Sequence, residues 1–401
     1  MAPPSDDGRT GFERQLVAEV AVTMAVKLLA ISFVLATRAR TLEQRFGGLD
    51  KMYRSHRHVA VAGYLLLVAH VAVVPWRFDS PGGVPAGLIA FGGLTVLTLL
   101  SIGPRLRPTR RIVTISYSAW KHTHRLVGVF FIFSIPHMFL VDSLIMDAFV
   151  ALGWVLAAYV VGVAAYFHRL LISRIAQPRV PYTVRATHRL DDATLEVVLT
   201  PDRDPIHFTA GQFVFVHFKQ PGLREPHPFT VASSPRERDL RLVVKATGDF
   251  TRRLHDQLQT GRSARVEGAY GMLDYRRGTP DQIWIAGGIG ITPMLAWLRD
   301  HPSHDHHIDL YYTVRHPGDA LFDHDIAEHA ARHPNLNYHL IISSTDGTLT
   351  AEDVAADTTA PLTTISVYMC GPVALINAFE QGFLNLGVAA SNIHYEEFAF
   401  R

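Results

Sequence analysis

The 401-residue sequence contains little charge and a single cysteine. Charged residues make up 18% of it, below the roughly 25% of an average soluble domain. The formal net charge of +2 provides no strong field for a polyanion, so we expect no nucleic acid partner. The lone Cys370 excludes an intramolecular disulfide framework, an iron–sulfur cluster held by four cysteines and a cysteine-rich zinc site. The hydrophobic share of 48% excludes a disordered chain.

The long apolar runs are confined to the first part of the chain. Five of them approach the roughly 20 mostly apolar residues that cross a bilayer, and they cover 16–36, 59–76, 84–102, 123–141 and 148–171. Beyond Pro178 the composition is that of an ordinary soluble α/β protein, and proline stops the preceding helix. We therefore expect a tail over 1–15, a transmembrane helical domain over 16–175 and a soluble part after it. The tail lacks the basic start of a signal peptide.

Lysine and arginine are distributed unevenly among the loops between these spans. The first loop carries Arg38, Arg40, Arg45, Lys51, Arg54 and Arg57, and the third carries Arg105, Arg107, Arg110, Arg111, Lys121 and Arg125. The second loop has only Arg77, and the fourth has none. Because basic loops stay in the cytoplasm, we expect a multi-pass cell-membrane protein with its N-terminus outside and its soluble part inside.

His70 lies inside the second expected span and His137 inside the fourth. Polar side chains at membrane depth are costly and usually face the bundle interior. Each has a partner nearer the cytoplasmic end of its own helix, His56 and His124. On one helix, His56 and His70 lie about 21 Å apart on nearly the same face. This pattern fits two stacked b-type haems, with His56 and His124 on the inner iron and His70 and His137 on the outer one. Gly63, between the two levels, would let a flat macrocycle approach the backbone.

The spacing within the fourth span is less regular. On a straight helix, His124 and His137 would be out of phase by about 140°. A kink at Pro136 would correct this phase error. Alternatively, His122 replaces His124, or His58 replaces His56, as the inner ligand.

Glycine-rich and strand-like motifs fill the soluble part. Residues 184–199 and 212–218 alternate in hydrophobicity as strands do. The motif HPFT covers 227–230, and the motif GGIGITP at 287–293 follows a short buried strand over 283–286. A glycine-rich turn between a strand and a helix lets backbone N–H groups approach a pyrophosphate.

The following strand, 308–314, ends at Arg315. A dinucleotide site that prefers an unphosphorylated ribose places an acidic residue near this point, whereas arginine suits a 2′-phosphate. The sequence therefore favours NADPH over NADH.

These features together resemble the NADPH oxidase and ferric reductase superfamily, as does the loop RFGGLDK at 45–51. The resemblance implies about five all-α transmembrane spans followed by a ferredoxin-reductase-like module. That module would comprise an antiparallel β-barrel FAD domain over 178–278 and a Rossmann-like α/β NADPH domain over 279–401. The family's membrane domain commonly has six spans, and the first one expected here corresponds to the family's second.

The resemblance also assigns roles to residues of the soluble part. The flavin-contacting residues are His227, Pro228, Phe229 and Thr230, with Ser233 and Thr251 near the ribityl and phosphate groups. The NADPH pyrophosphate turn comprises Gly287, Gly288, Gly290 and Thr292. Cys370 would lie beside the nicotinamide, and Phe398, with Phe400 as the alternative, would cover the flavin.

The function that follows is transmembrane electron transfer. Electrons would pass from cytoplasmic NADPH through FAD and two haems to dioxygen outside, producing superoxide. A ferric chelate or a partner protein are the alternative acceptors. The chain contains no calcium-binding EF-hand pattern, so we expect constitutive activity without an obligate regulatory subunit.

Overall fold

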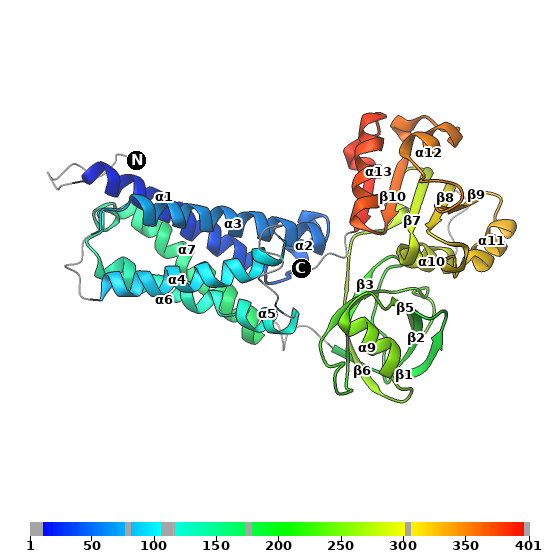
Figure 1. The fold of residues 1–401 in the computed structure, drawn as a ribbon, viewed down its shortest axis with the longest axis horizontal. Coiled ribbons are helices and arrows are strands. Elements are labelled where there is room, and N and C mark those ends of the chain that lie inside the picture. The colour runs from blue at the N-terminus through cyan, green and yellow to red at the C-terminus, as the bar shows by residue number, and fades with distance from the viewer. Residues whose placement is uncertain are drawn as a thin grey trace. The chain divides into compact units, whose positions relative to one another are not determined.

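The computed structural model describes residues 11–76, 82–105, 115, 117–172, 179–300 and 306–396. It divides into two compact units (Figure 1). The first comprises Met1–Leu42 and Lys51–Ala176, and the second comprises Glu43–Asp50 and Gln177–Arg401.

The first unit is a helical bundle. Its helices are α1 (Phe12–Leu35), α3 (Leu49–Val73), α4 (Gly83–Ile102), α5 (Tyr117–His124), α6 (Val127–Leu140) and α7 (Phe149–Phe167), and a short helix α2 (Arg40–Phe46) lies between the first two. Within the described residues, five segments are long and apolar enough to cross a membrane, the fourth being Ala119–Leu140. The five expected spans are therefore confirmed.

The outer surface of this bundle is apolar. Phe149, Trp154 and Val160 are among the most exposed large side chains, at 87%, 61% and 69%. A helix that is apolar on all sides belongs in lipid, where its backbone hydrogen bonds are satisfied internally. Inside the bundle, Phe131 is buried and packs against Phe33 and Tyr159 with ring centroids 5.1 and 5.2 Å apart.

The fourth span is interrupted between its two histidines. Helix α5 ends at His124 and α6 begins at Val127, with Arg125 and Leu126 in a turn between them. Pro136 lies inside α6. The turn at Arg125 and Leu126 changes the phase between the two histidines, a break that the sequence did not predict, and α6 continues through Pro136.

The second unit begins with an antiparallel barrel. Its strands are β1 (Arg179–Arg189), β2 (Thr194–Pro201), β3 (Phe213–Phe218), β4 (His227–Thr230), β5 (Leu240–Lys245) and β6 (Ser263–Tyr270), in the order β4-β3-β6-β1-β2-β5. A bridge between Val231 and Leu242 nearly closes the sheet. Helix α9 (Asp249–Gln257) follows β5, and Leu254 is buried in the barrel core.

A parallel sheet completes the second unit. Its strands are β7 (Asp281–Gly287), β8 (His307–Val314), β9 (Leu336–Ile342), β10 (Ser366–Cys370) and β11 (Ile393–Glu396), in the order β11-β10-β7-β8-β9. Its helices are α10 (Thr292–Arg299), α11 (Asp323–Arg332), α12 (Ala351–Asp357) and α13 (Val373–Asn385). Alternate residues of β7 face opposite layers: Trp284 packs in the core with α10, and Ile283 and Ile285 pack in the core with α13. The predicted fold class is thus confirmed.

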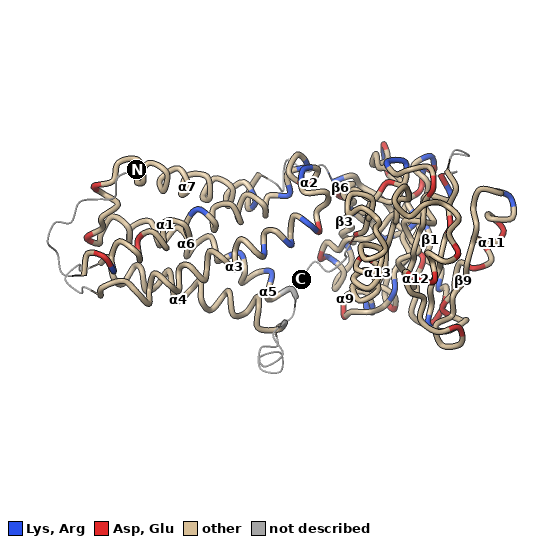
Figure 2. Tube along the Cα trace, turned by 90° about the horizontal axis from the view of Figure 1, so that it is seen from above, with Lys and Arg blue, Asp and Glu red and all other residues tan. Residues whose placement is uncertain are grey.

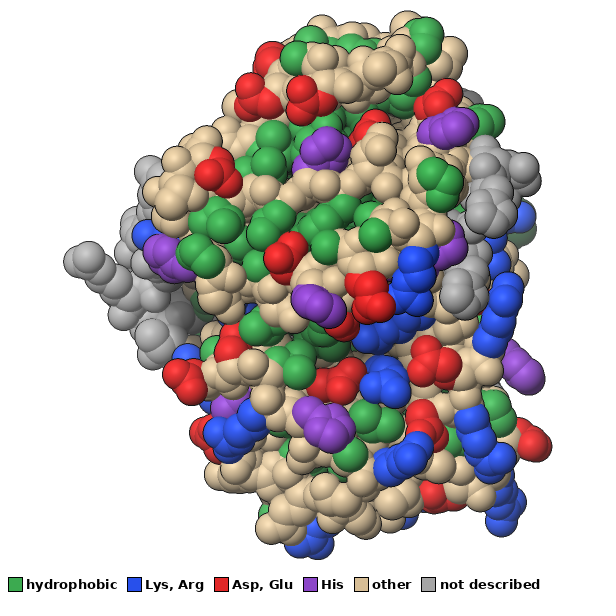
Figure 3. Space-filling model, turned by 90° about the vertical axis from the view of Figure 1, so that its right-hand side faces the viewer, with side chains coloured by type: hydrophobic (Ala, Val, Ile, Leu, Met, Phe, Trp, Pro, Cys, Tyr) green, Lys and Arg blue, Asp and Glu red, His purple; other side chains and the backbone are tan. Residues whose placement is uncertain are grey.

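The surface of the second unit is polar and mixed. Figure 3 shows acidic, basic and histidine side chains interspersed with small apolar areas, and Lys and Arg are most frequent over the lower half of this face. This surface contrasts with the apolar surface of the helical bundle, as the composition of the two parts predicts.

Candidate functional site

The four histidines singled out in the membrane spans are all held at the same ring nitrogen. His56 Nδ1 lies 2.8 Å from the Ser32 carbonyl oxygen, and His70 Nδ1 lies 2.9 Å from that of Ala18, both on α1. On α4, the Gly83 carbonyl lies 2.8 Å from Nδ1 of His137.

His124 is also held at Nδ1, but by a side chain instead of a backbone carbonyl. Its Nδ1 lies 3.2 Å from the Ser101 hydroxyl. That hydroxyl donates its own proton to the Leu97 carbonyl and accepts one from the Trp120 indole. Ser101 therefore has only an acceptor position left for His124.

These contacts fix the tautomer of all four rings. A backbone carbonyl only accepts, and Ser101 has no proton left to give, so each Nδ1 carries the hydrogen. Among the described residues, the Nε2 atoms have no hydrogen-bond partner. A metal-ligating histidine typically donates its second ring N–H in this way and offers the other nitrogen to the metal. The four imidazoles thus share the hydrogen-bonding pattern of a metal-ligating histidine.

The first histidine pair, His56 and His124, is brought together as expected. The two ring centroids lie 6.5 Å apart. Two imidazoles on opposite sides of one metal ion place their centroids about 6 Å apart, since each metal–nitrogen bond is about 2 Å and each nitrogen lies about 1 Å from its ring centre. The alternative ligands His58 and His122 lie on exposed faces of α3 and α5. The spacing fits an iron between His56 and His124.

The second histidine pair, His70 and His137, lines one cavity of the bundle. Gly87 on α4 makes room for one of these rings, because a Cβ atom there would lie 2.6 Å from the His137 imidazole. Gly63 does not have the role expected of it. A Cβ atom at Gly63 would meet the Ala25 carbonyl and Leu29, so this glycine allows α3 to pack closely on α1.

The segment expected to contact the flavin, 227–230, forms β4, which is a terminal strand of the barrel sheet. His227 stacks on Phe250 of α9 with ring centroids 3.6 Å apart and an interplanar angle of 10°. Ser233 is buried, and its hydroxyl accepts a hydrogen bond from the Arg241 backbone N–H at 3.1 Å. Thr251 caps the start of α9 by accepting from the Gly248 N–H at 3.0 Å.

Pro228, Phe229 and Thr230 complete β4, where Phe229 is buried and Thr230 is half-buried. The strand pairs with β3, and Phe213 lies opposite Thr230. The His227–Phe250 stack therefore places β4 next to the first turn of α9. An extended ligand such as FAD that contacted both expected segments would need them to be adjacent.

The glycine-rich turn joins β7 to α10 at the carboxyl edge of the parallel sheet. Gly288 has a φ of +54°, and a Cβ atom there would meet nothing within 4 Å, so its backbone faces open space. Gly290 differs, because a Cβ atom there would lie 2.2 Å from the Cys370 carbonyl oxygen. Gly287 lies similarly close to Pro372. Gly288 thus leaves space for a ligand, whereas Gly287 and Gly290 allow β7 and β10 to approach.

Thr292 and Arg315 flank this turn. Thr292 is buried, and its hydroxyl donates to the Ile289 carbonyl at 2.6 Å, which closes the turn before α10. Arg315 follows β8 at the same sheet edge, and its side chain is exposed. The carboxyl edge of a parallel sheet is where ligands bind in such folds.

Cys370 and Glu396 end the neighbouring strands β10 and β11, where they are paired in register. Both are buried, and burial raises the pKa of the Cys370 thiol above its ordinary range. Burial also raises the pKa of the Glu396 carboxyl from 4.5 to about 8. Glu396 accepts a hydrogen bond from the Met272 N–H at 2.9 Å. Phe398 and Phe400 lie outside the described residues.

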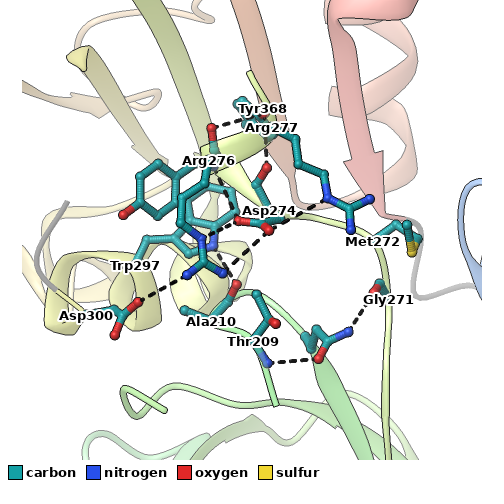
Figure 4. Close-up of polar contacts among 12 residues, drawn as sticks. Thr209, Ala210, Gly271, Met272, Asp274, Arg276, Arg277, Trp297, Asp300 and Tyr368 are labelled. Atoms are coloured by element: carbon teal, nitrogen blue, oxygen red, sulfur yellow. Dashed lines mark hydrogen bonds and ion pairs between the residues drawn. The ribbon is translucent and has the colours of Figure 1, made fainter. Parts of the chain in front are cut away.

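A polar junction joins the barrel to the parallel sheet around Asp274 (Figure 4). Trp297 of α10 donates from Nε1 to the Ala210 carbonyl of the barrel at 2.9 Å. Asp274 accepts from Arg276 Nε at 2.9 Å, and Arg276 also lies 3.9 Å from Asp300. These contacts fix the barrel and the sheet to each other within the second unit.

Two carboxylates were missed by the sequence reasoning. Glu396 has no role in the sequence analysis, although a carboxyl group at the end of a buried strand is itself a signal. Glu19 lies inside the first expected span, where a charged residue is a functional candidate by default. Its carboxylate accepts four hydrogen bonds in the helical bundle.

Comparison with known families divides the chain into three matched regions. Residues 21–135 match a ferric reductase like transmembrane component. Residues 181–280 match an FAD-binding domain, and residues 284–381 match an oxidoreductase NAD-binding domain.

Known proteins resemble parts of the chain. The carnitine monooxygenase reductase subunit of Escherichia coli (strain K12) is 30% identical over 197 residues, which is 48% of this chain and 59% of that protein. Ferric reduction oxidase 7 of Arabidopsis thaliana is 30% identical over 199 residues, covering 45% of this chain and 25% of that protein. The chain thus spans less than two thirds of either relative.

A solved structure matches nearly the whole length. A flavohemoglobin from Malassezia yamatoensis, with bound FAD and heme, has a TM-score of 0.55 at 18% identity and covers 96% of this chain and 99% of its own. At this identity the likeness shows the fold alone. The three family matches in succession, with five spanning helices before the barrel and the parallel sheet, make this chain a membrane oxidoreductase with the architecture of the NADPH oxidase and ferric reductase superfamily.

Proposed function

We propose that this chain transfers electrons across a membrane from NADPH, through FAD and two b-type haems, to dioxygen, which becomes superoxide. The observation that carries the proposal is the set of four imidazoles with Nδ1 held and Nε2 offered. One pair has a centroid separation of 6.5 Å, which suits a shared iron.

The first unit would hold the haems, and the second would hold FAD and NADPH. Bound FAD would take a hydride and release single electrons, which b-type haems carry onward. His56 and His124 would hold the inner haem, and His70 and His137 the outer one. Held by two imidazoles each, these haems would supply one-electron transfer.

In the second unit, β4 and the first turn of α9 would bind the flavin, with Thr230 bonding its ring. The space beside Gly288 would take the NADPH pyrophosphate, and the exposed Arg315 would bind its 2′-phosphate. Cys370 would lie beside the nicotinamide, and Phe398 would cover the flavin until the nicotinamide displaces it.

The orientation follows from the charges of the first unit. Figure 2 shows Lys and Arg concentrated at the end of the bundle that carries α2 and α5, and acidic residues prevail at the opposite end. Basic ends stay in the cytoplasm. We therefore place His56 and His124 near the inner side of the cell membrane, with the acceptor outside.

A ferric chelate is the second candidate acceptor. It is favoured by the match to a ferric reductase like transmembrane component and by the likeness to ferric reduction oxidase 7. The same histidine pairs would serve either acceptor.

One assay on the full chain in nanodiscs separates these outcomes. With FAD and NADPH, we expect b-type absorption bands from two haems per chain and superoxide-dismutase-sensitive reduction of cytochrome c. Ferric chelate reduction without superoxide would replace dioxygen by iron as the acceptor. A preparation without b-type bands would overturn the proposed electron path.

The variant His70→Leu tests the outer ligand. We expect one haem per chain, no reduction of the external acceptor and unchanged flavin reduction by NADPH. His58→Leu is the matched control, because His58 lies on the same helix α3 with an exposed side chain. Full acceptor reduction in His70→Leu would rule out this ligand.

A further inference from the structure

The Glu19 carboxylate sits in the first spanning helix, close to the second histidine pair. Glu19 lines the same cavity as His70 and His137, and it interacts electrostatically with His70. A charged side chain within a spanning helix is costly and needs a compensating role. None of the roles described so far accounts for it.

Four donors hold this carboxylate in one place. Oε1 accepts from the Leu144 N–H at 2.9 Å, and Oε2 accepts from the Ile145 N–H at 2.9 Å and from the Ser143 hydroxyl at 3.0 Å. Gln15, one turn earlier on α1, donates from Nε2 to Glu19 Oε1 at 2.9 Å. All four partners are donors, so both carboxylate oxygens of Glu19 act as acceptors.

Gln15 extends the same contact. It is 4% exposed, and its second amide hydrogen goes to the Asp142 carbonyl at 2.8 Å. Both hydrogens of the amide therefore point to acceptors, which fixes its orientation. Gln15 Oε1 is buried without a hydrogen-bond partner among the described residues. An unsatisfied buried acceptor is destabilising, so the arrangement holds Glu19 in place at a cost in stability.

Glu19 also lies between α1, which holds His70, and the segment that follows α6, the helix of His137. Helix α1 holds His70 through the Ala18 carbonyl, next to Glu19. The segment that Glu19 contacts, 143–145, lies two residues after Val141, whose N–H donates to the backbone carbonyl of His137 at 3.2 Å. Glu19 thus neighbours the residue that holds the His70 imidazole and contacts the segment that follows the helix of His137.

From this geometry we propose that Glu19 is a positioning and tuning residue of the outer haem site, whose fixed negative charge lowers the midpoint potential of that haem. The inference rests on the proposed function. A nearby negative charge stabilises the ferric state over the ferrous state, because the ferric iron carries one more positive charge. Net charge close to a haem is one of the means by which a protein sets its potential. A lower potential makes the outer haem a stronger one-electron donor to its acceptor.

Potentiometric titration of the full chain in nanodiscs tests this tuning. In Glu19→Gln, we expect the midpoint potential of one haem to rise and that of the other to stay unchanged. Glu13→Gln is the matched control, since it removes the same charge from an exposed position of α1. We expect it to leave both potentials unchanged, because solvent and salt screen that site.

The outcomes separate this inference from the proposed function. Wild-type protein without two b-type haems would remove the proposed function itself. Two haems with unshifted potentials in Glu19→Gln, or an equal shift in Glu13→Gln, would overturn only the role of Glu19. If Glu19→Gln loses a haem, Glu19→Asp decides: a retained haem at the wild-type potential supports the need for charge, and loss in both variants makes Glu19 purely structural and overturns the tuning.

Discussion

Gly87 and Gly92 lie on the same helix, α4, yet they have different surroundings. A Cβ atom at Gly87 would lie 2.6 Å from Nδ1 and Cε1 of His137, whereas one at Gly92 would meet nothing within 4 Å. Replacing either glycine by alanine favours the helix by about 0.5–1 kcal/mol. The difference between Gly87→Ala and Gly92→Ala therefore isolates the contact with the imidazole.

The size of the effect follows from the distances. Carbon atoms pack best at about 3.5–4.0 Å, so the His137 ring must retreat by about 1 Å in Gly87→Ala. A metal–nitrogen bond is about 2 Å long, so a shift of this size removes the imidazole from the iron. Overpacking of this kind costs about 1–3 kcal/mol. We expect Gly87→Ala to be less stable than Gly92→Ala by about that amount.

The assay measures haem per chain from the pyridine haemochrome spectrum and thermal unfolding of the same samples. Gly87→Ala should retain one haem per chain, and Gly92→Ala should retain two with equal or higher stability. Two haems per chain in a destabilised Gly87→Ala protein would refute the placement of His137 as a ligand. Equal damage in Gly92→Ala would refute the argument from packing.

Three further predictions concern the second unit. Arg315→Ala should raise the KM for NADPH about tenfold, or 1.4 kcal/mol, and leave that for NADH unchanged; equal effects in steady-state kinetics would remove the 2′-phosphate assignment. Trp297→Phe removes the donor to the Ala210 carbonyl and should lower the free energy of unfolding by about 1–3 kcal/mol, seen as a lower urea midpoint; an unchanged midpoint would contradict it. Because the pKa of Glu396 is raised from 4.5 to about 8, the folded state retains a proton that the unfolded state releases, and stability is lost as the pH rises across that window. Glu396→Gln should flatten this decline in thermal unfolding between about pH 5 and 8, and an identical pH profile in both proteins would exclude burial of the carboxyl as its cause.

The sequence predicted the elements that depend on composition and on local motifs. Five apolar runs of spanning length gave five helices, and the glycine-rich motif lies at the turn between β7 and α10 where it was expected. The approach of His56 to His124 was also expected, although the spacing left His122 and His58 open as alternatives. These features depend on residue types at fixed spacings along the chain, so a single sequence is enough to predict them.

Other features could not be predicted because no residue type or motif indicates them. The turn at Arg125 and Leu126 contains neither proline nor glycine, and Pro136 was the more obvious place for a break. The packing of Gly63 against α1 depends on which helices are neighbours. Glycine supports close approach to a ligand or to another helix, and only the structure distinguishes the two.

Three of the four histidines are held by backbone carbonyls, those of Ser32, Ala18 and Gly83. A backbone carbonyl is present whichever amino acid occupies the position, although at Gly83 a Cβ atom would lie 2.8 Å from the Leu140 carbonyl oxygen. Only His124 depends on a particular side chain, the Ser101 hydroxyl. We therefore expect Ser32→Ala to be tolerated and Ser101→Ala to free the His124 ring to rotate, which broadens the low-spin resonance of one haem. Among the residues that hold the four imidazoles, we therefore expect Ser101 to be less tolerant of alanine than Ser32.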